Sequence, residues 1–191
     1  MLYRYLLFIL ILSVPYSSCS QSTTKNVMRN WNTALVENLE WQTKQISDTF
    51  YLKMLSEKIG LINKDKDEGY LRKYLIEKLG AKIFNKETTI IYVANIHDEY
   101  AYLVNDEFLC QYILKKGEWE LIKQKKSSSD LSSEITNQLV FLDKCSDEVF
   151  ELPLYQEISI THFYNQEQVK SIYLVKICKQ HIDLLNKLNI Y

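Results

Sequence analysis

The sequence is poor in glycine and proline, which together make up six of its 191 residues, against a usual share of ~12%. The four glycines stand at positions 60, 69, 80 and 117, and no pair has the spacing of G-x-G-x-x-G or G-x-x-x-x-G-K-[ST]. In those motifs glycine lets the backbone approach a phosphate group. The sequence therefore predicts neither a dinucleotide-binding motif nor a P-loop, and we expect no cofactor.

Arginine is also scarce, and the formal net charge is only −1. Nucleic-acid-binding proteins usually carry a basic surface, so this balance excludes nucleic acid as the main partner. Hydrophobic residues are nevertheless 47% of the chain. That fraction predicts one folded domain with a sizeable core, because 191 residues are too few for two comfortable domains.

The N-terminus has the pattern of an export signal. Arg4 supplies a positive charge, an uncharged Leu/Ile-rich run covers Leu6–Val14, and Pro15 follows it. A membrane-spanning helix needs about 20 apolar residues, so this run is too short to span a bilayer. Its length is typical of the hydrophobic region of a signal peptide.

Small residues at positions 17 and 18 directly precede Cys19. This arrangement resembles the lipobox of bacterial lipoproteins, although Tyr16 stands where that family usually has an aliphatic residue. The resemblance implies cleavage before Cys19, a diacylglycerol thioether on its sulfur and an N-acyl chain such as palmitate. Such acyl chains are sufficient for stable membrane anchoring. An alternative cleavage before Gln21 would remove Cys19 and release a soluble secreted or periplasmic protein.

The resemblance also has implications for location. Ser20, rather than aspartate, follows Cys19, which in lipoproteins of Gram-negative bacteria implies the outer membrane. No acidic cluster follows, which favours the periplasmic side. We expect residues 1–18 to be the signal peptide, 19–26 a tether and 27–191 a single domain. The first 18 residues hold one basic residue and no acid, so cleavage shifts the net charge from −1 to −2.

Helical periodicity is clear in the first part of the domain. Apolar residues recur at steps of three and four from Trp31 to Met54, and Gly60 is expected to end this helical region. Asp48 and its neighbours predict a break into two helices. Acidic residues precede a further helix expected at Lys66–Leu79.

The period changes to two after residue 88. Four strands are expected, joined by short turns that force antiparallel neighbours, and the alternation predicts a sheet covered on one face. A surface connection at Lys123–Asp130, a helix with the stripe Leu131 to Leu142, a second hairpin and a helix at Lys179–Leu188 complete an α+β fold. The expected strands are Thr89–Ile96, Tyr100–Val104, Glu107–Leu114 and Glu118–Lys123, with the second hairpin at Glu157–Tyr164 and Gln168–Ile177.

Cysteine and histidine offer few catalytic candidates. Cys110 is expected to be a buried thiol, whereas Cys145 and Cys178 flank the second hairpin and could form a disulfide, although we favour free thiols. Cys178 with His181 is the one pair with a spacing that suits a Cys/His hydrolase. The other histidines, His97 and His162, are far away in the sequence, so no metal site is expected.

Fourteen tyrosines raise the alternative of glycan stacking. Tyr100, Tyr102 and Tyr112 are expected to share a region of the sheet, and we favour packing of that face against the N-terminal helices over an exposed binding platform. The sequence thus predicts a lipoprotein with a non-catalytic binding or structural domain and an unknown protein or glycan partner. An envelope hydrolase, Cys/His or metal-dependent, and an inhibitor or immunity lipoprotein are the alternatives.

Overall fold

A computed structural model describes residues 2–64, 69–127, 133–135, 149–152, 156–174 and 176–187, with side chains from Thr23 onward. The chain has the expected α+β architecture, with N-terminal helices, an antiparallel sheet and a small C-terminal helix. The helix expected between Leu131 and Leu142 lies mostly outside the described residues. Only 133–135 of it are described, and they are helical.

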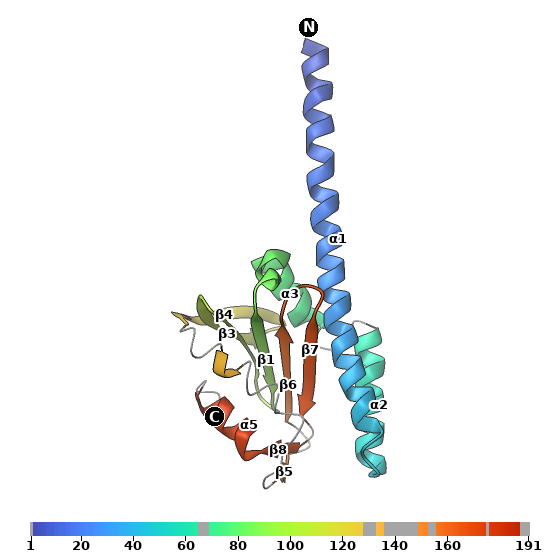
Figure 1. Cartoon of the computed structure of the whole chain (residues 1–191), viewed down its shortest axis with the longest axis vertical. Helices are drawn as coiled ribbons and strands as arrows, with labels where there is room; N and C mark the ends of the chain where they lie inside the picture. The colour runs from blue at the N-terminus through green and yellow to red at the C-terminus, as the bar shows by residue number, and fades with distance from the viewer. Residues whose placement is uncertain are drawn as a thin grey trace.

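Two helices form a hairpin at the start of the chain: α1 (Leu2–Thr43) and α2 (Thr49–Asn63). Asp48 confirms the predicted break, because its carboxylate accepts hydrogen bonds from the amides of Phe50 and Tyr51 as an N-cap. The predicted end of the second helix is wrong, since α2 continues through Gly60. The polar segment expected as a tether, residues 19–26, is helical and belongs to α1, which projects beyond the rest of the molecule in Figure 1.

The third helix, α3, spans Gly69–Leu79, and the short 3₁₀ helix η1 follows at Ala81–Asn85. Gly80 separates them with a φ of +75°, a left-handed conformation that glycine adopts without steric cost. This turn redirects the chain from α3 into the first strand of the sheet.

The main sheet has six strands in the order β4-β3-β2-β1-β6-β7, and all neighbours are antiparallel. The four predicted strands of the meander are present, and β1 pairs with the first strand of the predicted second hairpin. The strands are β1 (Thr88–Ala94), β2 (Glu99–Asn105), β3 (Phe108–Lys115), β4 (Glu118–Lys126), β6 (Glu157–Phe163) and β7 (Val169–Leu174).

A second sheet, which the sequence analysis did not predict, pairs β5 (Val149–Glu151) with β8 (Lys176–Cys178). Helix α5 (Lys179–Lys187) follows directly and confirms the predicted C-terminal helix. These elements lie at the end of the molecule opposite the projecting part of α1 (Figure 1).

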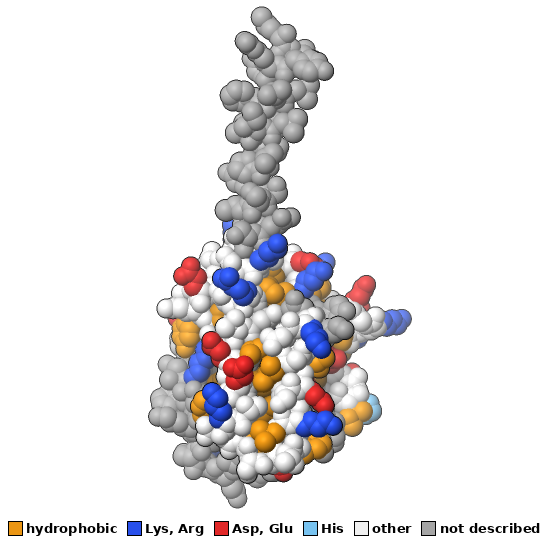
Figure 2. Space-filling model, turned by 90° about the vertical axis from the view of Figure 1, so that its right-hand side faces the viewer, with side chains coloured by type: hydrophobic (Ala, Val, Ile, Leu, Met, Phe, Trp, Pro, Cys, Tyr) orange, Lys and Arg blue, Asp and Glu red, His pale blue; other side chains and the backbone are white. Residues whose placement is uncertain are grey.

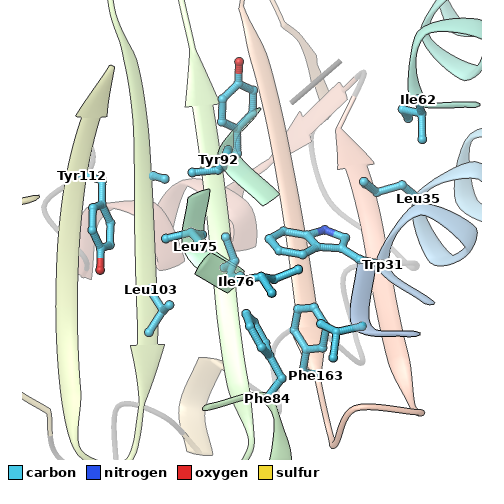
Figure 3. Packing of buried hydrophobic residues seen from close by; sticks show 14 of the residues in the cluster. Trp31, Leu35, Ile62, Leu75, Ile76, Phe84, Tyr92, Leu103, Tyr112 and Phe163 are labelled. Atoms are coloured by element: carbon cyan, nitrogen blue, oxygen red, sulfur yellow. The ribbon is translucent and has the colours of Figure 1, made fainter. Parts of the chain in front are cut away.

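One hydrophobic core lies between the helices and the sheet (Figure 3). Trp31 of α1 is 2% exposed, and its ring meets Phe163 of β6 edge to face, with 5.2 Å between the centroids. The indole nitrogen donates a hydrogen bond of 3.0 Å to Thr161 Oγ1, so the polar end of this large side chain is satisfied inside the core. Phe84 of η1 packs against Phe163 at 4.6 Å and completes the cluster.

A second core lies on the opposite face of the sheet, so the expectation of a sheet covered on one side is wrong. Ile91 of β1 and Ile160 of β6 are fully buried there, together with Leu185 of α5 and Ile135. Small polar residues of β6 alternate with its isoleucines and are buried as well, on the face that the helices cover. Thr161 and Ser159 are 2% and 3% exposed.

The outer edge of β7 is covered by side chains of α1. Asn38 Oδ1 accepts a hydrogen bond of 2.8 Å from the Tyr173 amide, and Gln42 Nε2 donates one of 2.5 Å to the Tyr173 carbonyl. The two amide side chains are also joined to each other, since Gln42 Nε2 lies 2.7 Å from Asn38 Oδ1. Two helical side chains one turn apart thus take the place of a neighbouring strand at this residue.

We predict that Asn38→Ala destabilises the protein by about 1–3 kcal/mol, because the Tyr173 amide loses its acceptor and Gln42 loses its partner. Urea unfolding followed by circular dichroism measures this difference. Glu40→Ala, an exposed change on the same helix, is the matched control and should alter stability by less than about 0.5 kcal/mol. Equal stability of the two variants would contradict the capping role of Asn38.

Candidate functional site

Cys19, the predicted lipidation site, lies within α1. Among the side chains of that helix that the structure describes, which begin at Thr23, the first to be fully buried is Val27 at 0% exposure, whereas Lys25 and Asn26 are exposed. Val27 is eight positions after Cys19 on this helix, a rise of about 12 Å. The buried residue Val27 thus lies about two helical turns after Cys19 on the same helix.

Cys178 does not have the free thiol that we favoured, because it is bonded in a disulfide. Its partner lies outside the described side chains, as does Cys145. The Cys178 amide donates a hydrogen bond of 3.1 Å to His181 Nδ1. That nitrogen is therefore already an acceptor and is not free to take a proton from a thiol. The pair lacks both the thiolate and the available base that a Cys/His hydrolase requires.

His162 and His181 are structural groups of the core. They are 1% and 2% exposed, and burial lowers the pKa of each imidazole to about 4. His162 Nδ1 lies 2.9 Å from the hydroxyl of Thr89 on the neighbouring strand, and Tyr164 packs edge-on against its ring. Both histidines are consequently neutral at physiological pH.

The third histidine, His97, is exposed in the turn between β1 and β2, where Asn95 Oδ1 caps the His97 and Asp98 amides. The three histidines thus belong to a turn, a strand and a helix. Among the described residues, no three His, Cys, Asp or Glu side chains come close enough together to hold a metal ion. In the same part of the chain, no helix has both the length and the apolar content that crossing a bilayer requires.

The three tyrosines considered for glycan stacking do not share a face. Tyr112 lies opposite Ala101 in the β2–β3 ladder, and Tyr102 lies opposite Gln111. Tyr112 consequently packs under the helices, where Tyr74 meets its ring at 6.0 Å, whereas Tyr100 and Tyr102 face the second core. Packing against the N-terminal helices is thus confirmed for Tyr112 and wrong for Tyr100 and Tyr102.

The described surface carries open grooves. One of them, of about 510 Å³, runs between α1 and the end of α2 and is lined by Lys25, Arg29 and Glu37 around Val36 and Ile62. On the side of the molecule where α2 lies, basic and acidic side chains are interspersed with exposed hydrophobic ones (Figure 2). This mixed groove has no cluster of one charge sign that would select a particular ligand.

The feature that the sequence analysis missed is the length of β4. The strand was expected to end at Lys123 and to lead into a surface connection, but it continues to Lys126. Eight of its nine residues are exposed, Trp119 being the exception. Polar residues on both faces obscured the period-two signal, and such a pattern is what an outermost strand needs.

Comparisons with protein-family models, with curated proteins and with solved structures find no match to this chain.

We predict that acidification destabilises the fold through the buried histidines. An unfolded histidine titrates near pH 6.5, whereas His162 and His181 titrate at about 4 in the folded chain, so the unfolded state binds more protons between these values. Stability is therefore complete above pH ~6.5 and falls by about 1–3 kcal/mol per histidine as the pH drops to ~4.

Urea unfolding at a series of pH values measures this loss. His162→Gln, which keeps a hydrogen-bonding side chain beside Thr89, should have a shallower pH dependence than the parent. The exposed His97→Gln serves as the control and should follow the parent curve. An unchanged pH dependence in His162→Gln would show that the buried imidazole does not contribute.

Proposed function

We propose that the protein is an exported lipoprotein of the bacterial cell envelope, anchored through acyl chains on Cys19, whose domain binds or supports another envelope component without catalysis. The order of the N-terminal features supports this proposal. A positive residue, Arg4, precedes the uncharged run Leu6–Val14, and two small residues precede the cysteine.

The observation that carries the proposal is that Cys19 and the buried core residue Val27 lie on one continuous helix, α1. The processed chain would keep 25 residues of α1, from Cys19 to Thr43. Because Cys19 and Val27 belong to one helix, acyl chains on the cysteine would hold the domain within about 12 Å of the lipid surface. The anchor would thus be a stiff connection.

The state of Cys178 supports a binding or structural role over a Cys/His hydrolase. Its sulfur is bonded in a disulfide. His181 Nδ1, the nitrogen that a general base would use here, accepts a hydrogen bond from the Cys178 amide. A disulfide also suits an oxidising compartment outside the cytoplasm. Ser20 after the lipid-bearing cysteine favours the outer membrane, with the domain on the periplasmic side.

We predict that Cys19→Ser abolishes anchoring. In a Gram-negative host, the parent protein should partition into the detergent phase and give an N-terminal peptide that begins at an acylated Cys19. The variant should incorporate no labelled palmitate and should leave the membrane fraction. Fractionation, metabolic labelling and mass spectrometry of the N-terminus measure these outcomes.

Cys110→Ala is the control, because it removes a buried thiol of the domain and leaves the N-terminus intact. This control should be acylated like the parent. A parent chain that begins at Gln21 without acyl groups would replace anchoring with plain secretion. A Cys19→Ser variant that fractionates with the membrane as the parent does would overturn the proposal.

A further inference from the structure

Strand β4 is the outermost strand of the six-stranded sheet on the side away from β7. Its middle carries two adjacent exposed apolar residues, Leu121 at 47% and Ile122 at 46% exposure. No other described strand pairs with the outer side of β4. An unpaired strand edge of this length presents a row of backbone donors and acceptors, which is a template for pairing with another strand.

A β-bulge at Ile122 changes which side chains of β4 share a face. Leu121 pairs with Tyr112 and Lys123 pairs with Gln111, so Ile122 has no partner on β3. Without the bulge, Glu120 and Lys123 would lie on opposite faces, because their positions differ by three. The extra residue brings them to the same face.

Cross-strand pairing on β3 identifies this face. Glu118 and Glu120 lie opposite Lys115 and Ile113, and Lys123 and Lys125 lie opposite Gln111 and Leu109. Paired residues point to the same side of a sheet. One face of β4 therefore carries two acids before the bulge and two bases after it.

These charged side chains form few ion pairs within the chain. Between described residues, the one ion pair that involves these charges joins Lys115 Nζ to Glu120 Oε2 at 3.9 Å, with both side chains more than half exposed, which is a weak interaction. In the part of the chain that the structure describes, Glu118, Lys123 and Lys125 belong to no ion pair. One face of the strand thus carries charges of both signs, with the acids before the bulge and the bases after it.

We propose that β4 pairs antiparallel with β4 of a second copy of this chain about a two-fold axis through Leu121–Ile122. Such an axis, perpendicular to the sheet, reverses the strand direction and keeps each side chain on its face. It sets Glu118 opposite Lys125 of the second copy and Glu120 opposite Lys123. The pair of chains then gains four cross-strand ion pairs, and the exposed Leu121 and Ile122 side chains meet at the axis.

The order of the charges favours a second copy over another partner. Lysines and bulges on an edge strand normally discourage strand addition. A purely acidic peptide would satisfy Lys123 and Lys125 but would face Glu118 and Glu120, and like charges directly opposite are unfavourable. A second copy running antiparallel satisfies both halves. A single strand pair buries little area, so the dimer is expected to be weak and sensitive to salt.

We predict that charge reversal on either half of β4 breaks the dimer. Glu118→Lys with Glu120→Lys places four lysines opposite four, and Lys123→Glu with Lys125→Glu places four glutamates opposite four. Each double variant should weaken self-association by about tenfold or more. A mixture of the two double variants should form a heterodimer at least as tight as the parent dimer, because every opposite position then pairs an acid with a base.

The full-length chain, in an excess of detergent micelles, is suited to sedimentation velocity between 50 and 500 mM salt, with circular dichroism as the check on folding. Glu57→Lys with Glu77→Lys, on exposed faces of α2 and α3, makes the same change in net charge as the Glu118→Lys, Glu120→Lys variant and should dimerise like the parent. The parent dimer should weaken as salt increases, which tests the idea without any variant.

Three results would overturn the proposal: a parent that is monomeric at 100 µM and 50 mM salt, a dimer that both double variants retain, or a mixture that does not restore association. Binding of an acidic peptide in place of self-association would also overturn it. Because the contact lies in β4, the outcome does not depend on whether Cys19 is acylated.

Discussion

The side chain of Trp31 connects the N-terminal helix to the sheet. Its ring fills the space beside Phe163, and its indole nitrogen is held by Thr161, which in turn lies 2.8 Å from Ser171 on β7. One residue thus links α1 to two adjacent strands through both apolar and polar contacts. The position of α1 relative to the sheet depends on this contact, and so does the distance between Cys19 and the sheet.

Polar groups inside the two cores act in the same way. Thr89 and His162 join β1 to β6, and Lys58 of α2 reaches Glu157 at the start of β6 with 2.5 Å between nitrogen and oxygen. Buried polar groups are costly unless they are paired, so each of these contacts favours one register and one placement of the helices. His162 and His181, which a search for chemistry selects first, are therefore part of the packing.

Much of the fold could be predicted from periodicity. The strands of the meander were predicted within a few residues because their connections are short, and Asp48 marked the helix break through its capping chemistry. The faces of Tyr102 and Tyr112 were not predicted, because they depend on the pairing of Ala101 with Tyr112 across a turn. Three-residue strands such as β5 leave too short a pattern, and cysteine spacing does not determine whether Cys178 is oxidised.

The candidate site was predicted less well than the fold. Cys19 is a prediction from a local motif, whereas the charge arrangement of β4 depends on a bulge, and one unpaired residue on a strand has no sequence signature. In a regular strand, Glu120 and Lys123 would point to opposite faces. They share a face only because Ile122 has no partner on β3. Sequence spacing alone would therefore have separated the charges that the structure places together.

The amide pair of Asn38 and Gln42 has a further consequence for assembly. The Asn38 and Gln42 side chains use the backbone hydrogen-bonding groups of Tyr173, so α1 blocks the β7 edge of the six-stranded sheet. Among the described strands of this sheet, only the outer edge of β4 is left open. A sheet with two open margins can add copies indefinitely and grow into a fibre. A sheet with one can add a single copy, after which growth stops.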